Sequence, residues 1–188
     1  SIAALVWVGW GYSLAFTSGG SSALAPFVGS LDKAFLANVS ATTYAATFSN
    51  NVYLPEFVFV VFQMTFACIT PALIVGAFAE RIRFTSYILF IVLFCLCIYC
   101  PLAHATWHPK GLLFGWGVLD FAGGTVVHMS AGWAALAGAI FLGKRKVQKV
   151  NPARITYVLL GTGLLWFGWF GFNAGSAVGA NGLAAQAL

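Results

Sequence analysis

The chain has 188 residues, of which 61% are hydrophobic and only 7% carry a charge, and its mean hydropathy is +0.91. These few charged side chains cannot cover the surface of a water-soluble domain. The composition therefore excludes a water-soluble domain and indicates a segment that lies in a lipid bilayer. The net charge of +5 does not indicate a nucleic-acid partner, because most Lys and Arg residues fall in two short segments between apolar runs.

Apolar runs of about 20 residues, long enough for a helix to cross a bilayer, occur four times, and a shorter one begins the chain. We therefore predict an all-α membrane protein, a polytopic helix bundle with five passes of which the first is truncated. The chain begins without Met inside an apolar run, so we expect a piece of a longer protein. The predicted passes are 2–16, 57–79, 84–105, 121–142 and 155–177.

Basic residues predict the orientation of these passes, because short loops rich in Lys and Arg stay on the cytoplasmic side. Alternate loops hold seven and two of these residues. We expect 80–83 and 143–154 to be cytoplasmic, and 17–52 and 106–120 to be external.

The long external loop, 17–52, opens with a turn-rich stretch and then becomes mildly apolar. We expect it to cover the mouth of the protein as a short helix or a wrap. Asn38 begins an Asn-Val-Ser tripeptide that matches an N-glycosylation acceptor, whose use the sequence leaves open.

Four cysteines lie inside the apolar runs, and three of them follow a C-x-C-x-x-C pattern. Three ligands on one continuous helix give poor tetrahedral geometry, so we interpret the cysteines as packing residues and expect neither a metal nor a cofactor. The residues are Cys68, Cys95, Cys97 and Cys100.

Polar side chains inside a predicted pass indicate function, because they face the protein interior or an aqueous path. His128 lies about two turns, or about 12 Å, inside the pass that begins near Asp120. It is either a structural histidine whose ring nitrogens are hydrogen-bonded within the protein or part of a transport pathway. Nearby glycines allow neighbouring helices to approach closely; they are Gly123, Gly124, Gly132 and Gly138. Asp120 fits both a helix cap and an electrostatic well for a cation.

Trp107 follows the third pass at its external end, beside His104. Tryptophan near a helix end is an ordinary interfacial anchor. Together with phenylalanines at depth, its ring face also has the chemistry of a cation-π cage.

Three runs resemble signature blocks of the ammonium transporter (Amt/Mep/Rh) family and occur in the family's order. They are FQMTFACIT at 62–70 continuing to GAFAERIRF at 76–84, DFAGGTVVH at 120–128, and GWFGFNAGS at 168–176. The resemblance covers nearly the whole chain apart from the external loop.

The resemblance implies an eleven-helix fold of two inverted five-helix repeats and a last helix, assembled as a homotrimeric channel with one pore per subunit. This chain resembles the end of helix 2 through helix 6, so the helix bearing the partner of the pore histidine is absent. The implied substrate is ammonium or ammonia, with methylammonium as an analogue, and a regulatory protein is expected at the cytoplasmic face.

The resemblance also assigns roles to single residues. Trp107 and Ser176 resemble the outer recruitment site, with Phe62 lining it and Asp120 as the acidic residue nearby. Phe66 and Phe172 resemble the stacked pair that closes the outer end of the pore, and His128 resembles the first pore histidine. Supporting positions are Tyr99 and Asn173. Two departures from the family pattern are Pro71, which we expect to interrupt the second pass, and an insert at 108–110 that places Lys110 near a cation mouth.

Transport of ammonium is the predicted function: the cation is recruited outside, deprotonated, and conducted as ammonia, with or without a relayed proton. An ammonium sensor coupled to a signalling domain is the alternative, since the same residues serve it. We do not expect an enzyme. Ser176, His128 and Asp120 do not form a hydrolytic triad, because Asp120 lies two turns from His128 and cannot orient its ring.

Overall fold

The computed structural model describes residues 2–19, 23–46, 52–146 and 154–188. The chain divides into two compact units. The first comprises Ser1–Tyr44 and Pro55–Leu142, and the second Ala45–Leu54 and Gly143–Leu188.

Four helices are long and apolar enough to cross a membrane: Glu56–Phe78, Phe84–Gly115, Gly124–Leu142 and Ile155–Gly175. The shorter apolar helix Ile2–Phe16 precedes them. Together they confirm the predicted polytopic helical membrane fold.

The first helical segment spans Ile2–Phe16 and contains a π-helical turn. Its parts are α1 (Ile2–Val6), η1 (Trp7–Gly11) and α2 (Tyr12–Phe16). Inside the turn, the Trp7 indole N–H donates to the carbonyl of Val60, 3.1 Å away. Trp7 is only 1% exposed and meets the ring of Tyr99 edge-on at 6.2 Å. This indole therefore joins the first helix to its two neighbours in the core.

The helix α3 (Glu56–Phe78) runs through Pro71 without a break. Our expectation that this proline interrupts the pass is wrong. A proline removes one backbone N–H from the helix and crowds the carbonyl four residues earlier. Around it, Thr70 Oγ1 donates to the Phe66 carbonyl at 2.7 Å, and Tyr87 Oη donates to the Pro71 carbonyl at 2.7 Å. The first bond lies within α3, and the second joins α3 to the helix that carries Tyr87.

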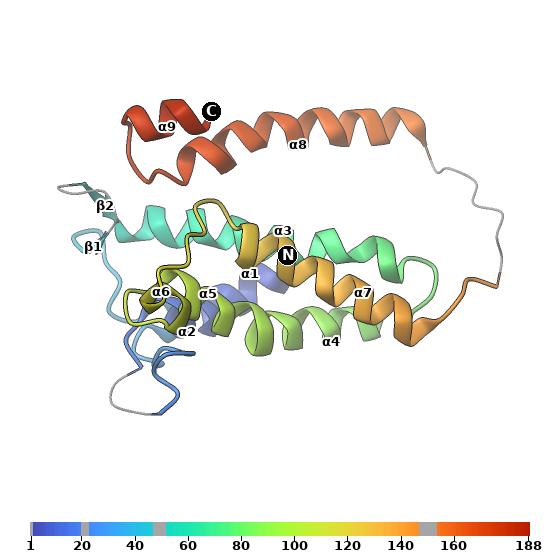
Figure 1. The fold of residues 1–188 in the computed structure, drawn as a ribbon, viewed down its shortest axis with the longest axis horizontal. Coiled ribbons are helices and arrows are strands. Elements are labelled where there is room, and N and C mark those ends of the chain that lie inside the picture. The colour runs from blue at the N-terminus through green and yellow to red at the C-terminus, as the bar shows by residue number, and fades with distance from the viewer. Residues whose placement is uncertain (1, 20–22, 47–51, 147–153) are drawn as a thin grey trace. The chain divides into compact units, whose positions relative to one another are not determined.

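Within the span Phe84–Gly115, the continuous helix runs from Phe84 to Trp107, two residues beyond the predicted end. It comprises α4 (Phe84–Phe94), a π-helical turn η3 (Cys95–Tyr99) and α5 (Cys100–Trp107). A short helix, α6 (Leu112–Gly115), follows. In Figure 1, α2, α5 and α6 lie at one end of the first unit, and the turn from α3 to α4 lies at the other. The loops predicted to be external and cytoplasmic are thus separated.

The helix of the fourth predicted pass begins at Gly124, three residues later than the sequence predicts. A π-helical turn, η4 (Gly124–Met129), leads into α7 (Ser130–Leu142). Gly123 has a φ of 90°, a left-handed conformation that favours glycine. A right-handed helix that began at residue 121 could not continue through this conformation. Farther along, Gly138 faces the ring of Phe78 so closely that a Cβ would overlap it. The absence of a side chain there lets α7 pack on α3.

The loop between α2 and α3 wraps back onto the helix ends. Its short turns include η2 (Ala34–Leu36). Ser13 Oγ donates to the Ser30 carbonyl at 2.9 Å and accepts from the Lys33 backbone N–H at 2.9 Å. Two short strands that the sequence analysis did not predict, β1 (Tyr44–Ala46) and β2 (Tyr53–Pro55), pair with each other.

The second unit contains α8 (Ile155–Gly175), in which most residues are exposed and none is buried. It ends two residues before the predicted limit of this pass. A further helix that the sequence analysis did not predict, α9 (Gly182–Ala187), is capped by Asn181, whose Oδ1 accepts the Ala184 N–H at 3.0 Å.

Candidate functional site

An aromatic cluster of Phe62, Phe66 and Trp107 joins α3 to the end of α5. The Phe62 and Phe66 rings lie 4.9 Å apart at 68°, and the Phe66 and Trp107 rings lie 6.0 Å apart at 87°. Phe66 is 2% exposed, whereas Phe62 and Trp107 are partly exposed. The cluster therefore runs from two partly exposed rings to one buried ring. Three of the residues predicted for recruitment and gating meet here.

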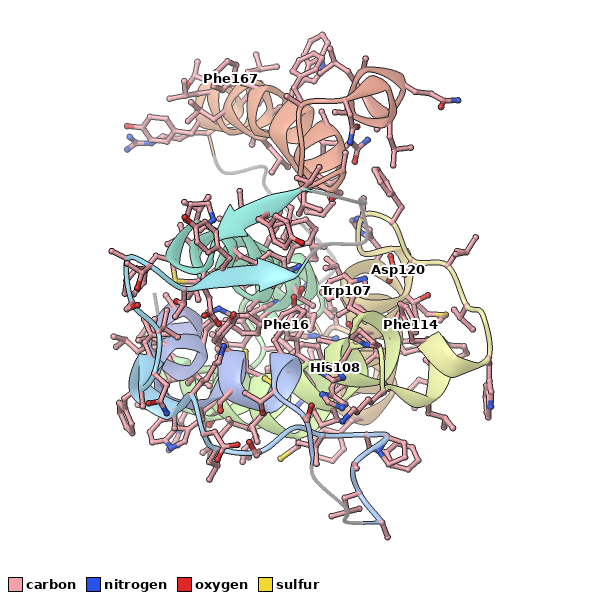
Figure 2. The ribbon with its side chains drawn as sticks, turned by 90° about the vertical axis from the view of Figure 1, so that its left-hand side faces the viewer. Phe16, Trp107, His108, Phe114, Asp120 and Phe167 are labelled. Atoms are coloured by element: carbon pink, nitrogen blue, oxygen red, sulfur yellow. The ribbon has the colours of Figure 1, made fainter. Side chains whose placement is uncertain are left out.

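The indole of Trp107 is fixed by a bond to the segment that precedes η4. Its Nε1–H donates to the backbone carbonyl of Asp120 at 2.9 Å, and Figure 2 shows the two residues side by side. Because the ring edge is fixed in this way, the ring face is held in one orientation. An oriented indole face is the group that binds cations best among aromatic side chains.

Asp120 caps the π-helical turn from outside the helix. Its Oδ1 accepts the Gly123 N–H at 2.6 Å, and its Oδ2 accepts the N–H groups of Thr125 and Val126 at 2.8 and 2.9 Å. These donors have no partner within the helix, and a carboxylate there also meets the positive end of the helix dipole. The sequence left open a helix cap and an electrostatic well for a cation, and the cap uses both carboxylate oxygens. The backbone carbonyl of Asp120 contacts Trp107.

His128 lies four residues after the helix begins, not about two turns inside it. It is exposed in this chain, between the buried Val127 and Ser130. Its backbone N–H donates to the Gly123 carbonyl at 3.0 Å. The distance expected from the sequence was too long because it counted the residues before Gly124 as helix.

Tyr99 is fully buried in η3. Within the part of the chain that the structure describes, its hydroxyl has no hydrogen-bond partner. The Tyr99 ring makes an edge contact with the ring of Trp7. Among the described residues, it makes no ring contact with the aromatic cluster.

Phe172, Asn173 and Ser176 lie near the end of α8 in the second unit. Phe172 stacks on Trp169 with ring centres 5.0 Å apart. Ser176 is 4% exposed, and its hydroxyl donates to the Phe172 carbonyl at 2.7 Å. A hydroxyl has one proton and two lone pairs, so this bond commits the proton and leaves the oxygen as an acceptor. Asn173 is partly exposed.

Two polar groups at the end where α5 finishes were given no role by the sequence analysis. His104 is fully buried and contacts backbone carbonyls from two distant segments. Glu56 is 2% exposed, accepts a hydrogen bond of 2.7 Å from Tyr12 Oη, and forms an ion pair with Lys33. Glu56 begins α3 one residue before the predicted pass. An acidic residue after proline, next to an apolar run, was the signal for it.

The chain has no group of His, Cys, Asp and Glu side chains arranged to hold a metal ion among the described residues. Of the four cysteines, Cys95 and Cys100 are buried, Cys68 is partly buried and Cys97 is exposed. Lys110, which the sequence places near the predicted cation mouth, is exposed.

Comparison with known proteins matches the whole chain to one family. A model described as the Ammonium Transporter Family matches residues 1–188. A putative ammonium transporter of Methanothermobacter thermautotrophicus is 50% identical over 100% of this chain and 44% of its own length. An ammonium transporter of Bacillus subtilis is 46% identical with the same coverage.

Solved structures agree with the sequence comparison. The crystal structure of Saccharomyces cerevisiae Mep2 superposes with a TM-score of 0.83 at 37% identity, covering 98% of this chain and 40% of that one. Candida albicans Mep2 gives a TM-score of 0.80 at 38% identity, with 95% and 39% covered. The chain thus spans less than half the length of the proteins it matches.

Proposed function

The chain belongs to the ammonium transporter family, and on this premise we propose that the protein of which it forms part moves ammonium across a membrane. The observation that supports this most is the aromatic cluster at the end of α5, in which an oriented indole leads to a buried phenylalanine. The proposed substrate is ammonium, and methylammonium is the analogue for measuring it.

Recruitment of the cation takes place at the face of Trp107. A cation over an indole face gains about 0.5–2 kcal/mol, with the larger values in desolvated sites. Phe62, partly exposed beside the cluster, lines the approach. From the motif alone, we assign Ser176 to the same site. Its oxygen is available to accept an N–H from ammonium, a contact that potassium cannot make, because potassium has no proton to donate.

Passage beyond the mouth requires that the charge be removed. A bare cation in an apolar path costs several kcal/mol, and Phe66, which is 2% exposed, closes the path to water on its side. The motif assigns Phe172 as the second ring of this gate. Deprotonation costs less free energy than moving the charged ammonium ion into the apolar path, so ammonia is the species conducted.

His128 takes part as the pore histidine of this half of the protein. An imidazole both donates and accepts hydrogen bonds near neutral pH, so it suits a path for ammonia and for a relayed proton. Its partner belongs to the part of the protein outside this chain. We further propose a homotrimer, in keeping with the family resemblance, and a regulatory protein at the cytoplasmic face.

Uptake of methylammonium into liposomes containing the purified full-length protein tests this proposal. We expect saturable uptake that ammonium inhibits and that equimolar potassium leaves unchanged. In the His128→Ala variant, with assembly unchanged by size-exclusion chromatography, we expect uptake to fall.

Two outcomes contradict parts of the proposal. Saturable binding of methylammonium without uptake supports the sensing function instead of transport. Full uptake by His128→Ala, with potassium still excluded, removes the relay role of His128 and leaves recruitment standing.

A further inference from the structure

In the external loop, segment 31–36 turns its cation toward the protein and its large apolar side chains outward. Lys33 pairs with the buried Glu56 at the start of α3, and its side chain is 30% exposed. Leu31 and Phe35, two residues to either side, are 58% and 68% exposed. A loop in water favours the opposite pattern, with the cation outside and the apolar side chains covered. The segment therefore has the pattern of a chain in apolar surroundings.

The ring of Phe35 packs on the outside of the first helix. It meets the Trp10 ring edge-on, with ring centres 5.1 Å apart and planes at 68°. Its edge also lies over Gly9, where an added Cβ would be 3.7 Å from the ring. Trp10 is itself 42% exposed. The two rings thus form one partly exposed apolar surface, which we call the Trp10–Phe35 patch.

The backbone of the segment adopts an uncommon conformation to present this ring. Phe35 and Leu36 have φ values of 54° and 59°, in the left-handed region that bulky side chains rarely adopt. Such a conformation costs free energy and persists only where surrounding contacts hold it. Here the contacts are the ion pair between Lys33 and Glu56 and the ring contact with Trp10. The position of the Phe35 ring is therefore fixed by the fold.

Two hydrogen bonds show how the patch is placed along α3, which is long and apolar enough to cross a membrane. Trp7 Nε1–H donates to the Val60 carbonyl, and Tyr12 Oη donates to Glu56 Oε1. As residue numbers rise along the first helix, those of their partners fall along α3. Trp10 lies between the two donors in the sequence, so the patch is beside the first turn of α3.

The first turn of α3 lies at the edge of the apolar part of a bilayer. The 23 residues of α3 extend over about 34 Å, slightly more than a hydrocarbon core of about 30 Å. In its own helix, Trp10 lies six residues, or about 9 Å, before the end at Phe16. Aromatic side chains gather at this boundary between headgroups and acyl chains. The depth of the patch therefore matches the boundary.

We propose that segment 31–36 enters the outer leaflet of the bilayer and that the Trp10–Phe35 patch packs against lipid at the boundary between headgroups and acyl chains. Lipid is favoured over a second copy of the chain because the patch borders membrane-spanning helices at this depth, and because the cation of the segment is already paired inside the protein. The contact anchors in lipid a loop that the sequence analysis placed wholly outside the membrane. The proposal depends on the membrane fold and not on transport of ammonium.

Photo-crosslinking of the full-length protein in liposomes tests this contact. Phe35→p-benzoylphenylalanine places at the patch a ring that, on irradiation, bonds to a C–H group within its reach. We expect the peptide that carries position 35 to gain the mass of a lipid. Ser40→p-benzoylphenylalanine is the matched control, because Ser40 is exposed in the same loop and its hydroxyl bonds to that of Thr42. The peptide that carries position 40 should gain no lipid.

Three outcomes overturn the proposal. Crosslinks from position 35 to a second copy of the chain would make the patch a subunit interface. Crosslinks to a part of the protein outside residues 1–188 would show that the protein itself covers the patch. The absence of lipid adducts at position 35, or an equal share of them at both positions, would remove the specific contact with lipid.

A second position keeps the test decisive where the Phe35 variant does not assemble, as judged by size-exclusion chromatography. Trp10→p-benzoylphenylalanine places the same probe on the other ring of the patch, and the same outcomes decide. The readout is the mass of a crosslinked peptide and not the uptake of methylammonium. Failure of the lipid contact and failure of transport are therefore distinguishable.

Discussion

Trp107 and Asp120 are joined by a hydrogen bond of 2.9 Å from the indole Nε1–H to the backbone carbonyl of the aspartate. Asp120 also caps η4 with its carboxylate, so one residue both begins a helix and orients the ring that we assign to recruitment. The stability of the cap and the geometry of the mouth are therefore linked.

Asp120→Asn should destabilise the protein. An amide oxygen replaces only one of the two oxygens that accept backbone N–H groups, and the loss of a cap costs about 0.5–2 kcal/mol. Thermal unfolding of the detergent-solubilised full-length protein measures it. Asp32→Asn is the matched control, because Asp32 is exposed and makes the same change of charge. Equal melting temperatures, with ammonium affinity lost in Asp120→Asn alone, would favour the electrostatic well over the cap.

Gly138→Ala should weaken the packing of α7 on α3. The new methyl group overlaps the Phe78 ring, and overpacking of this kind costs about 1–3 kcal/mol. Gly132→Ala is the control on the same helix, since a Cβ there has no neighbour within 4 Å in the described chain. Thermal unfolding compares the two, and Gly138→Ala should cost less when it is made in a Phe78→Ala background, where the ring that it overlaps is absent. The same loss in both alanine variants would show that the Phe78 contact is not its cause.

The pair Lys33–Glu56 should show non-additive effects on stability. Lys33→Met leaves the buried carboxylate of Glu56 with the Tyr12 hydroxyl but without its cation. The cost should lie below the about 3–5 kcal/mol of a fully buried pair, because the Lys33 side chain is 30% exposed. The double variant with Glu56→Gln removes the stranded charge, so it should melt above Lys33→Met alone. Strictly additive shifts would contradict a direct interaction.

The sequence predicts the long helices well because each is an apolar run bounded by charged or turn residues. It misplaces the start of the fourth pass. The apolar run begins at Phe121, whereas the backbone becomes helical only after Gly123, at φ 90°. The π-helical turns at Trp7, Cys95 and Gly124 escape a pattern based on 3.6 residues per turn.

The site shows the same division. Family motifs single out Phe62, Phe66 and Trp107, which meet in the structure. The two carbonyl contacts of His104 join it to residues 89 and 79 positions earlier in the chain. Contacts at that sequence distance depend on how the loop wraps, which neither hydropathy nor a local motif determines.

The half-saturating methylammonium concentration in liposomes measures whether ammonium is recruited at the face of Trp107. Trp107→Leu removes the ring face and should raise this concentration about 2- to 30-fold, the equivalent of about 0.5–2 kcal/mol. Trp107→Phe retains a ring without the N–H and should lie between the wild type and Trp107→Leu. An unchanged half-saturating concentration in Trp107→Leu, at equal protein density, would contradict recruitment at this residue.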